Sequence, residues 1–309
     1  MIKGIHHIAL AVADLGAAER FHCQAAQLRP VDAAALDLPL PGGASAARML
    51  AGANCALRLL EVAADEAGPL RPVSQAGITH YCLQSVDMKA LHASFEGAGA
   101  SFHSGPVDLG TGFLYCYSRD LEANVIELEG VAPVWEDPRP WFAHVAISSY
   151  GLPHLAGFYE AVFGSTAKRS PRLANNRRMD RVAGLPNVAL EAAWIPGPNL
   201  QVELMQYFEP ATVQPESPPA ADAPGYSYIA LEVDDVQAEL ARLCRLGARE
   251  PQELAHYRRD RLAFCADPEG NLLLLLSIKP AHQALSFAAL PDPFIAARLA
   301  ASTPQKDSP

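Results

Sequence analysis

The pattern of hydrophobic and polar residues along the chain repeats four times. In each repeat a polar or aromatic residue precedes a short apolar run with the composition of a β-strand, and three of the four runs lead to an aspartate. The runs are HIALAVADL from His7, HYCLQSVDM from His80, HVAISSYGL from His144 and YIALEVDDV from Tyr228. Such recurrence indicates that one structural unit occurs four times in the chain.

The residues that follow each run complete the unit. An amphipathic stretch comes first, with apolar residues at spacings of three and four, which predicts a helix. Shorter strand-like segments follow, and each unit closes on a second apolar run, at 55–62, 124–130, 200–208 and 271–278. The sequence therefore predicts four strand–helix–strand–strand–strand units, over residues 1–63, 76–130, 140–209 and 224–279.

Proline-rich segments separate the later units. APVWEDPRP lies between the second and third units, and EPATVQPESPPAADAP lies between the third and fourth. After about residue 280 the sequence predicts a short helix in PFIAARLAA and a disordered polar end, STPQKDSP.

Four βαβββ units of this kind resemble the vicinal oxygen chelate superfamily, which includes glyoxalase I, methylmalonyl-CoA epimerase, extradiol dioxygenases and fosfomycin-resistance transferases. The resemblance extends from residue 4 to about residue 279. It implies an α+β fold in which the four modules pair into two cupped mixed β-sheets. We expect an N-terminal module pair with a metal site at 1–130, a C-terminal pair with a degenerate site at 140–279, and a tail at 280–309.

The resemblance also implies a divalent metal inside a cup, bound by residues of the first and last strands of two paired modules. In the first pair these positions hold His7, Arg58, His80 and Glu127. We expect His7, His80 and Glu127 to bind the metal, whereas His6 faces away because successive strand residues point to opposite faces. Two imidazoles and one carboxylate leave open positions, which favours Fe(II) but also suits Mn(II), Zn(II) or Co(II).

The equivalent positions of the second pair are His144, Glu203, Tyr228 and Leu274. Leucine cannot bind a metal, and tyrosine is an uncommon substitute for the second histidine. This pair is therefore expected to be a structural partner or to hold an apolar pocket, lined by Tyr228, Met205 and Trp194.

Two further residues are candidates for catalysis. A guanidinium cannot bind a cation, so Arg58 either holds a substrate carboxylate or enolate beside the metal, or pairs with Glu61 or Glu129. Tyr117, in YSRDLEANVIE, partly matches an extradiol dioxygenase signature and is otherwise a packed aromatic residue.

The resemblance implies a metal-dependent enzyme for a substrate that binds through two oxygen atoms, and the three-ligand set favours a dioxygenase-like, ring-cleaving oxidoreductase. The alternatives are a non-oxidative isomerase, lyase or transferase of the glyoxalase, epimerase or fosfomycin-resistance type, and a ligand-sequestering protein of the bleomycin-resistance type. No glycine-rich loop follows a strand, so no nucleotide cofactor is expected.

Composition restricts the partners. The net charge of −10, from 34 acidic and 24 basic residues, argues against nucleic acid and anionic membranes. No apolar run is long enough to span a membrane, and the N-terminus lacks the order of a signal peptide. Six scattered cysteines without a Cys-x-x-Cys pair fit reduced thiols in a cytoplasm. We expect a small-molecule substrate and a monomer or a homodimer, since dimers are common for such folds.

Overall fold

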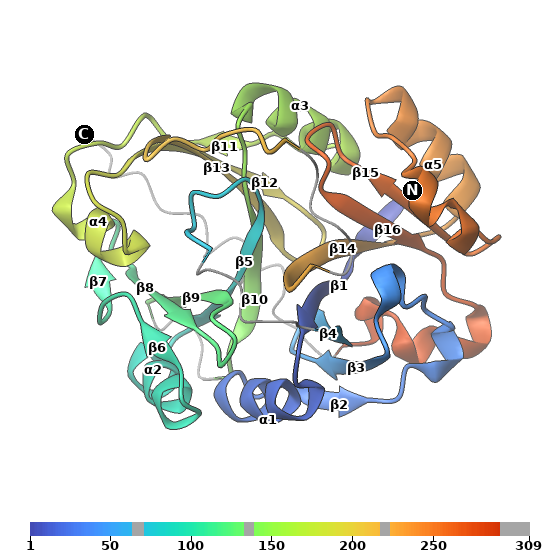
Figure 1. Ribbon diagram of the computed structural model, residues 1–309, viewed down its shortest axis with the longest axis horizontal. Coiled ribbons are helices and arrows are strands. Elements are labelled where there is room, and N and C mark those ends of the chain that lie inside the picture. Colours follow the sequence, from blue (N-terminus) through green and yellow to red (C-terminus); the bar gives the residue numbers. More distant parts are fainter. Residues whose placement is uncertain (64–70, 133–138, 217–222, 291–309) are drawn as a thin grey trace.

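The computed structural model describes residues 1–63, 71–132, 139–216 and 223–290, and its strands form two mixed β-sheets (Figure 1). The α+β fold with two sheets built from repeated units is confirmed. Residues 133–138 and 217–222 of the two proline-rich segments, the predicted helix in PFIAARLAA and the polar end STPQKDSP lie outside the described residues.

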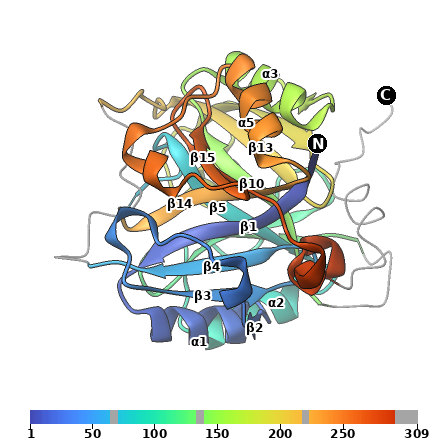
Figure 2. The ribbon, with the colours of Figure 1, turned by 90° about the vertical axis from the view of Figure 1, so that its right-hand side faces the viewer.

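The first sheet, here called sheet A, has seven strands. In spatial order they are β15 (Leu262–Ala266), β16 (Leu272–Leu276), β14 (Gly225–Val233), β1 (Ile2–Val12), β4 (Ala56–Glu61), β3 (Ala46–Ala51) and β2 (Arg29–Val31). The segment after β16 forms two short 3-10 helices, η4 (Pro280–Leu285) and η5 (Phe287–Ala289), beside sheet A (Figure 2). There the Ser286 hydroxyl donates a hydrogen bond to the buried Glu232 carboxylate of β14.

The second sheet, sheet B, has nine strands. They are β11 (Lys168–Arg169), β12 (Ala189–Pro196), β13 (Gln201–Glu209), β10 (Trp141–Ser148), β5 (Gly77–Ser85), β9 (Val125–Gly130), β8 (Leu114–Arg119) and β6 (Ser101–Phe102), with β7 (Val107–Asp108) paired to β8. The four predicted units are present, although in the fourth unit the strand before β15 is reduced to a bridge between Arg249 and Ala266.

The units pair differently from the prediction. In sheet A, β1 of the first unit runs antiparallel to β14 of the fourth, and in sheet B, β5 of the second unit runs antiparallel to β10 of the third. The pairing predicted within 1–130 and within 140–279 is therefore corrected. Each first strand pairs in parallel with the last strand of its own unit, and its other edge can accept the first strand of any other unit. The pattern of a single unit does not specify which one it accepts.

Five α-helices accompany the strands in the described ranges. They are α1 (Leu15–Ala25), α2 (Met88–Gly97), α3 (Leu152–Phe163), α4 (Arg177–Ala183) and α5 (Val236–Arg245), and the shorter 3-10 helices η1 (Ala34–Leu36), η2 (Pro41–Gly43) and η3 (Gln252–Tyr257) lie in connections. The aspartate that ends three of the predicted strands caps the following helix, because its side chain accepts a hydrogen bond from the backbone N–H three residues later. These caps are Asp14, Asp87 and Asp235.

Strand alternation divides the interior into three hydrophobic cores. On β1, Ile8 and Leu10 enter a large core shared by the helices and both sheets, whereas Ala9 and Ala11 enter a separate core inside the cup of sheet A. The cup of sheet B has its own lining of aromatic and aliphatic side chains. Each sheet therefore turns one face to the common core and the other to a cup.

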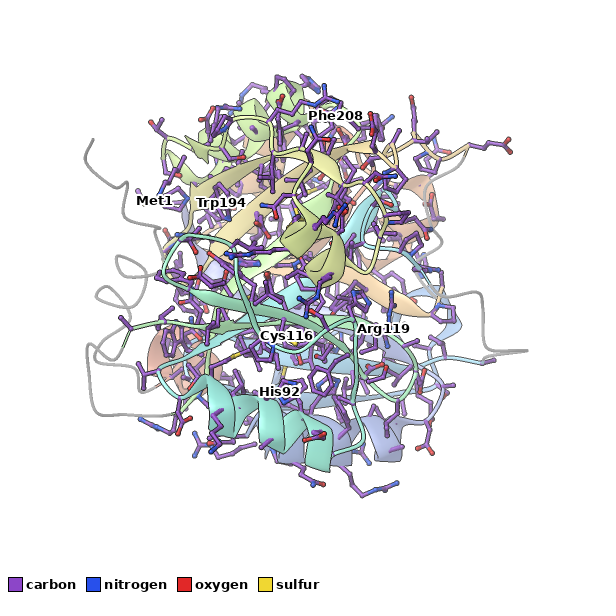
Figure 3. The ribbon with its side chains drawn as sticks, turned by 90° about the vertical axis from the view of Figure 1, so that its left-hand side faces the viewer. Met1, His92, Cys116, Arg119, Trp194 and Phe208 are labelled. Atoms are coloured by element: carbon purple, nitrogen blue, oxygen red, sulfur yellow. The ribbon has the colours of Figure 1, made fainter. Side chains whose placement is uncertain are left out.

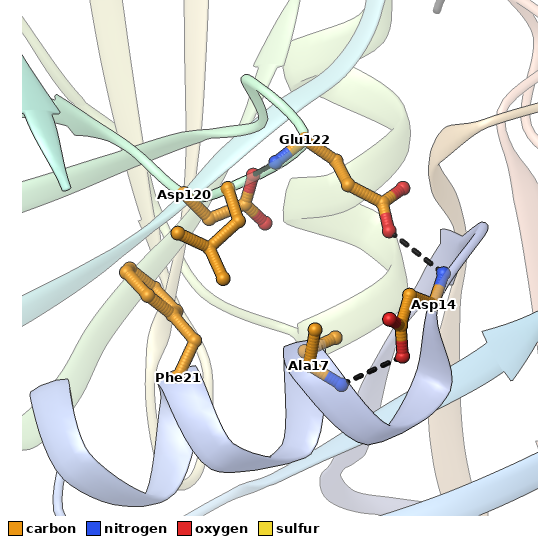
Figure 4. Close-up of a pocket in the computed structure, with 7 residues that line it drawn as sticks. Asp14, Ala17, Phe21, Asp120 and Glu122 are labelled. Carbon is orange, nitrogen blue, oxygen red and sulfur yellow. Dashed lines mark hydrogen bonds between the residues drawn. The ribbon is translucent and has the colours of Figure 1, made fainter. Parts of the chain in front are cut away.

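A repeated turn, D-x-E-x-N, joins units that follow one another in the sequence. At 120–124, backbone N–H groups donate to the Asp120 side chain. The Glu122 carboxylate accepts hydrogen bonds at the start of α1 from the backbone N–H of Ala13 and from that of Asp14, and the second of these is drawn in Figure 4. The same turn at 267–271 places Glu269 at the start of α3. Consecutive units are thus linked by these turns, while the sheets link the first unit to the fourth and the second to the third.

Candidate metal centre

Four acidic and imidazole side chains converge on one point inside the cup of sheet B. They come from the first and last strands of the second and third units, and they are His80 on β5, Glu127 on β9, His144 on β10 and Glu203 on β13. The antiparallel pairing of β5 with β10 brings the two histidines together, and the parallel strands β9 and β13 bring one glutamate from each side. All four residues are buried.

The distances between the four groups are those of a compact cluster. His144 Nε2 lies 2.8 Å from Glu127 Oε2 and 3.0 Å from Glu203 Oε2. His80 Nε2 lies 3.3 Å from the same Glu127 oxygen and 3.8 Å from that of Glu203. The four donor atoms lie within 4.8 Å of one another, so a single ion can contact all of them.

The residues fit a divalent cation. His80 Nε2 and Glu203 Oε2 are buried and have no well-aligned hydrogen-bond partner among the described residues, so both direct unsatisfied polar atoms at the centre of the cluster. Two carboxylates also bring a formal charge that a divalent ion would neutralise. Imidazole and carboxylate are the donors that Zn(II), Mn(II), Fe(II) and Co(II) share in proteins.

The pKa values of His144 and Glu127 also reflect the negative charge of the two carboxylates. Burial opposes the charged form of His144, but Glu203 and Glu127 raise the pKa of His144 well above its usual range. Burial likewise opposes the charged form of Glu127, yet the hydrogen bond from His144 and the proximity of both His144 and His80 lower the pKa of Glu127 to about 2. The two carboxylates therefore stabilise a positive charge at this point, either a proton on His144 or a bound cation.

A cavity of about 290 Å³ opens above the cluster. Its floor includes Glu127, His144 and Glu203. Tyr117 on β8 also lines it, with its ring centroid 5.0 Å from that of His80. The cavity is large enough for a small substrate that contacts the cluster.

The walls of the cavity differ in polarity. On the side of β5 and β9 they carry Gln84 and Glu129, and burial together with the Glu127 carboxylate raises the pKa of Glu129 to about 8. On the side of β12 and β13 they carry Trp194 and Met205, two residues of the expected apolar pocket. The third, Tyr228, lies in sheet A instead. Gln84 and Glu129 were not predicted to line the site, although the spacing of Glu129 from Glu127 on one strand places both on one face.

Helix α4 was not predicted from the sequence. Together with the segment that precedes it, α4 lines one side of the cavity. Met179 and Val182 face the cavity from α4, and Arg172 lies at its edge with its guanidinium 4.0 Å above the Phe208 ring. Figure 3, which looks onto the α4 side, labels Trp194 and Phe208. Arg172 is the cavity residue suited to an anionic group of a substrate.

The structure brings together His80 and Glu127 but not His7. His7 lies on β1 in sheet A, so the predicted set of His7, His80 and Glu127 is corrected: the partners of His80 and Glu127 are His144 and Glu203. The four repeats contained information on which units pair to form the donor set. The two units whose last strands carry Arg58 and Leu274 cannot complete a metal site, and pairing those two units leaves a full donor set in the others.

Comparison with known proteins agrees with this architecture. The model of the glyoxalase/bleomycin resistance protein/dioxygenase superfamily matches residues 4–128, and the glyoxalase-like domain model matches residues 144–276. The chain belongs to the vicinal oxygen chelate superfamily. No curated protein sequence matches the chain.

Solved structures with the same fold span almost the whole of this superfamily member. Glyoxalase I from Zea mays is 16% identical with a TM-score of 0.61, over 91% of this chain and 95% of that one. A point mutant of the same enzyme has a TM-score of 0.63 at 15% identity, with the same coverage. A putative dioxygenase from Bacillus subtilis subsp. subtilis str. 168 is 14% identical with a TM-score of 0.57, over 93% and 87% of the two chains. At these identities the likeness shows the fold alone.

The cup of sheet A holds a chain of hydrogen bonds at the positions equivalent to the metal donors. Arg58 donates from Nη1 to the Tyr228 hydroxyl at 2.6 Å, and that hydroxyl lies 3.4 Å from His7 Nε2. His7 Nδ1 lies 2.7 Å from His6 Nδ1, and His6 Nε2 lies 2.8 Å from the carbonyl oxygen of Leu285. Arg58 can only donate and the Leu285 carbonyl can only accept. Each hydrogen bond of the series therefore has its donor on the Arg58 side and its acceptor on the Leu285 side.

This arrangement replaces the predicted roles of Arg58 and His6. Arg58 is buried in the cup of sheet A, which lacks the His–Glu cluster. No carboxylate in the described part of the chain forms an ion pair with Arg58. His6 is buried as well, contrary to the prediction that it faces outward. Burial lowers the pKa of both His6 and His7, which keeps the two imidazoles neutral.

Proposed function

We propose that the protein is a metal-dependent isomerase or lyase that acts on a small substrate bound through two neighbouring oxygen atoms and does not consume O2. The observation that supports this proposal is the set of four donors at His80, Glu127, His144 and Glu203. A divalent metal at this position would act as a Lewis acid that polarises a substrate carbonyl.

The number of donors favours a non-oxidative reaction over the ring-cleaving dioxygenase predicted from three donors. An octahedral ion with four protein donors keeps about two open positions, enough for the two oxygens of the substrate. A dioxygenase that binds both substrate oxygens and O2 at one iron needs about three, as a facial triad provides. The dioxygenase remains the second candidate, supported by the position of Tyr117 beside His80.

The reaction also needs a base and a site that excludes water, and residues of the cavity would provide both. Glu203 lines the cavity, and the carboxylate oxygen that is not counted among the four donor atoms would take a proton from a carbon next to the bound carbonyl. The apolar surface of Trp194, Met205 and Val182 excludes water from the substrate. Fe(II), Mn(II), Zn(II) and Co(II) all suit this chemistry.

The proposal also covers the cellular compartment and the oligomeric state of the protein. All six cysteines are free, which supports a reducing compartment such as the cytoplasm. In the described ranges no helix combines the length and hydrophobicity that crossing a bilayer requires. Since the four donors come from one chain, a homodimer is not required to complete the centre.

Proton exchange tests the proposal. Protein loaded with each of the four metals is incubated under nitrogen in D2O with a panel of α-hydroxy ketones and 2-hydroxy acids, and NMR follows the proton on the carbon next to the carbonyl or carboxyl group. We expect exchange or isomerisation without O2, loss of it in Glu203→Gln, and no change in Glu191→Gln, which alters the adjacent strand outside the cavity. Turnover that requires Fe(II) and O2, observed with catechols in an oxygen electrode, would support the dioxygenase instead.

A further inference from the structure

We propose that Glu129 and Gln84 form a second binding point in the cavity of sheet B, which receives a hydrogen-bond donor of the substrate next to its two metal-binding oxygens. The inference rests on the proposed function, because it assumes that the substrate is held at the centre formed by the four donors. It narrows the substrate class to small molecules with three adjacent polar groups, two oxygens that bind the metal and one hydroxyl or N–H group.

The position of Glu129 supports this role. It follows Glu127 by two residues on β9, so both side chains leave the same face of the strand. A carboxylate oxygen of Glu129 lies within 4.8 Å of the donor atoms of Glu127 and His144. A group on an atom adjacent to a metal-bound oxygen therefore comes within reach of Glu129.

Gln84 lies beside Glu129 and leaves an acceptor free. In the parallel pairing of β5 with β9, Gln84 is the partner of Glu129 and donates a hydrogen bond from Nε2 to its carboxylate. Gln84 Oε1 is buried and has no hydrogen-bond partner in the described structure, and the residue lines the cavity at 1% exposure. The free oxygen of Gln84 and the Glu129 carboxylate together attract a donor.

The other half of the cup shows that the fold does not require this pair. The units that form sheet B place His80 and His144, and Glu127 and Glu203, at equivalent positions. Four residues beyond each histidine stand Gln84 and Ser148, and two residues beyond each glutamate stand Glu129 and Met205.

Met205 is buried in the apolar wall at the position equivalent to Glu129, and Ser148 donates to the Val73 carbonyl instead of facing an acid. Burying a carboxylate where the equivalent strand buries a methionine costs free energy. A bound donor group would offset that cost. The opposite apolar wall then takes the remainder of the substrate, which fixes its orientation.

A pair of chelating probes tests the inference. Catechol and pyrogallol bind a metal through the same two hydroxyls, but pyrogallol carries a third hydroxyl next to them. Each is titrated under nitrogen into cobalt-loaded protein, and the visible absorption of cobalt reports the dissociation constant. We expect the wild type to bind pyrogallol about 10-fold more tightly than catechol, since one additional buried hydrogen bond is worth about that factor.

The variant Glu129→Met copies the other half of the cup, and we expect it to bind both probes equally while its affinity for catechol stays within about threefold. Gln84→Leu is expected to reduce the preference as well, and it serves if the first variant does not fold. The control is Glu191→Met, which makes the same exchange of glutamate for methionine on β12 outside the lining of the cavity and keeps the wild-type preference.

A preference for pyrogallol that is the same in wild type, Glu129→Met and Gln84→Leu would overturn this inference alone. A cobalt spectrum that neither probe changes in the wild type would overturn the proposed function, and the inference with it. The two failures are therefore distinguishable.

Discussion

His144 Nε2 lies 2.8 Å from Glu127 Oε2, although the two residues belong to different repeat units. This contact joins the second unit to the third at the centre of one cup. The candidate metal centre is therefore a product of how the units pair and is not contained in any one of them. In the other cup the equivalent contact is between Tyr228 and Arg58, where the guanidinium donates a hydrogen bond to the hydroxyl and no ion can be held.

Metal affinity should depend on the residues of sheet B and not on His7. We expect His144→Ala and Glu203→Ala to weaken cobalt binding by more than about 100-fold, since even groups that only support a donor cost 10- to 100-fold when removed. Competition with a chromophoric chelator measures the affinity. His7→Ala is the matched control and should bind cobalt like the wild type. A loss in His7→Ala together with retention in His144→Ala would contradict the assignment.

Much of this architecture could be predicted from the sequence. The four units and the aspartates that begin α1, α2 and α5 follow from the local pattern, because capping and strand alternation act within a few residues. The partner of each first strand could not be predicted, since β1, β5, β10 and β14 offer chemically similar edges and packing of the whole chain decides between them.

For the same reason, only part of the candidate cluster could be associated from the sequence. His80 and Glu127 lie in one unit on adjacent strands, so the repeat was enough to associate them. His144 and Glu203 were identified as an equivalent pair, but their contact with the first pair depends on β5 meeting β10. α4 was missed because its seven residues are mostly charged and form only a short apolar face.

Breaking the hydrogen-bond chain in sheet A should reduce stability without affecting the metal centre. Tyr228→Phe removes the hydroxyl between Arg58 and His7 and leaves two buried polar groups without that partner. We expect the free energy of unfolding to fall by about 2 kcal/mol, the cost of a buried unsatisfied group. Urea denaturation measures it.

The control for this variant is Tyr207→Phe in sheet B. Tyr207 is equally buried, but among the described residues its hydroxyl donates a hydrogen bond only to the sulfur of Met205, at 3.6 Å, so its loss should cost less than about 1 kcal/mol. Equal losses in the two variants would indicate that the chain in sheet A contributes nothing beyond packing.

The turn that joins the first two units makes a separate prediction. Glu122 accepts hydrogen bonds from two backbone N–H groups at the start of α1, at 2.8 and 3.0 Å. We expect Glu122→Ala to lower the free energy of unfolding by about 1 kcal/mol, as the loss of a helix cap does, and Glu122→Gln, which keeps an acceptor, to lower it by about half as much. Thermal unfolding of the two variants measures the difference, and identical melting temperatures would show that the acceptor is not needed.

Stability should fall in mild acid because of His22 on α1. This residue is fully buried, and burial lowers its pKa from 6.5 to about 3. Between these values the unfolded state binds more protons than the folded state, so the contribution of His22 is complete above pH 6.5 and is lost as the pH falls toward 3. The loss amounts to about 1.4 kcal/mol per pH unit.

The neighbouring Asp120 acts in the opposite direction, since burial raises its pKa to about 6 and its contribution is lost as the pH rises through that value. The variant His22→Gln retains Asp120 and removes only the imidazole. We therefore expect the free energy of unfolding, measured in urea from pH 7 to pH 4, to fall less steeply in His22→Gln than in the wild type, by about 1 kcal/mol per pH unit. Parallel pH profiles would mean that protonation of His22 does not lower the stability, because the imidazole is the titrating group that the substitution removes.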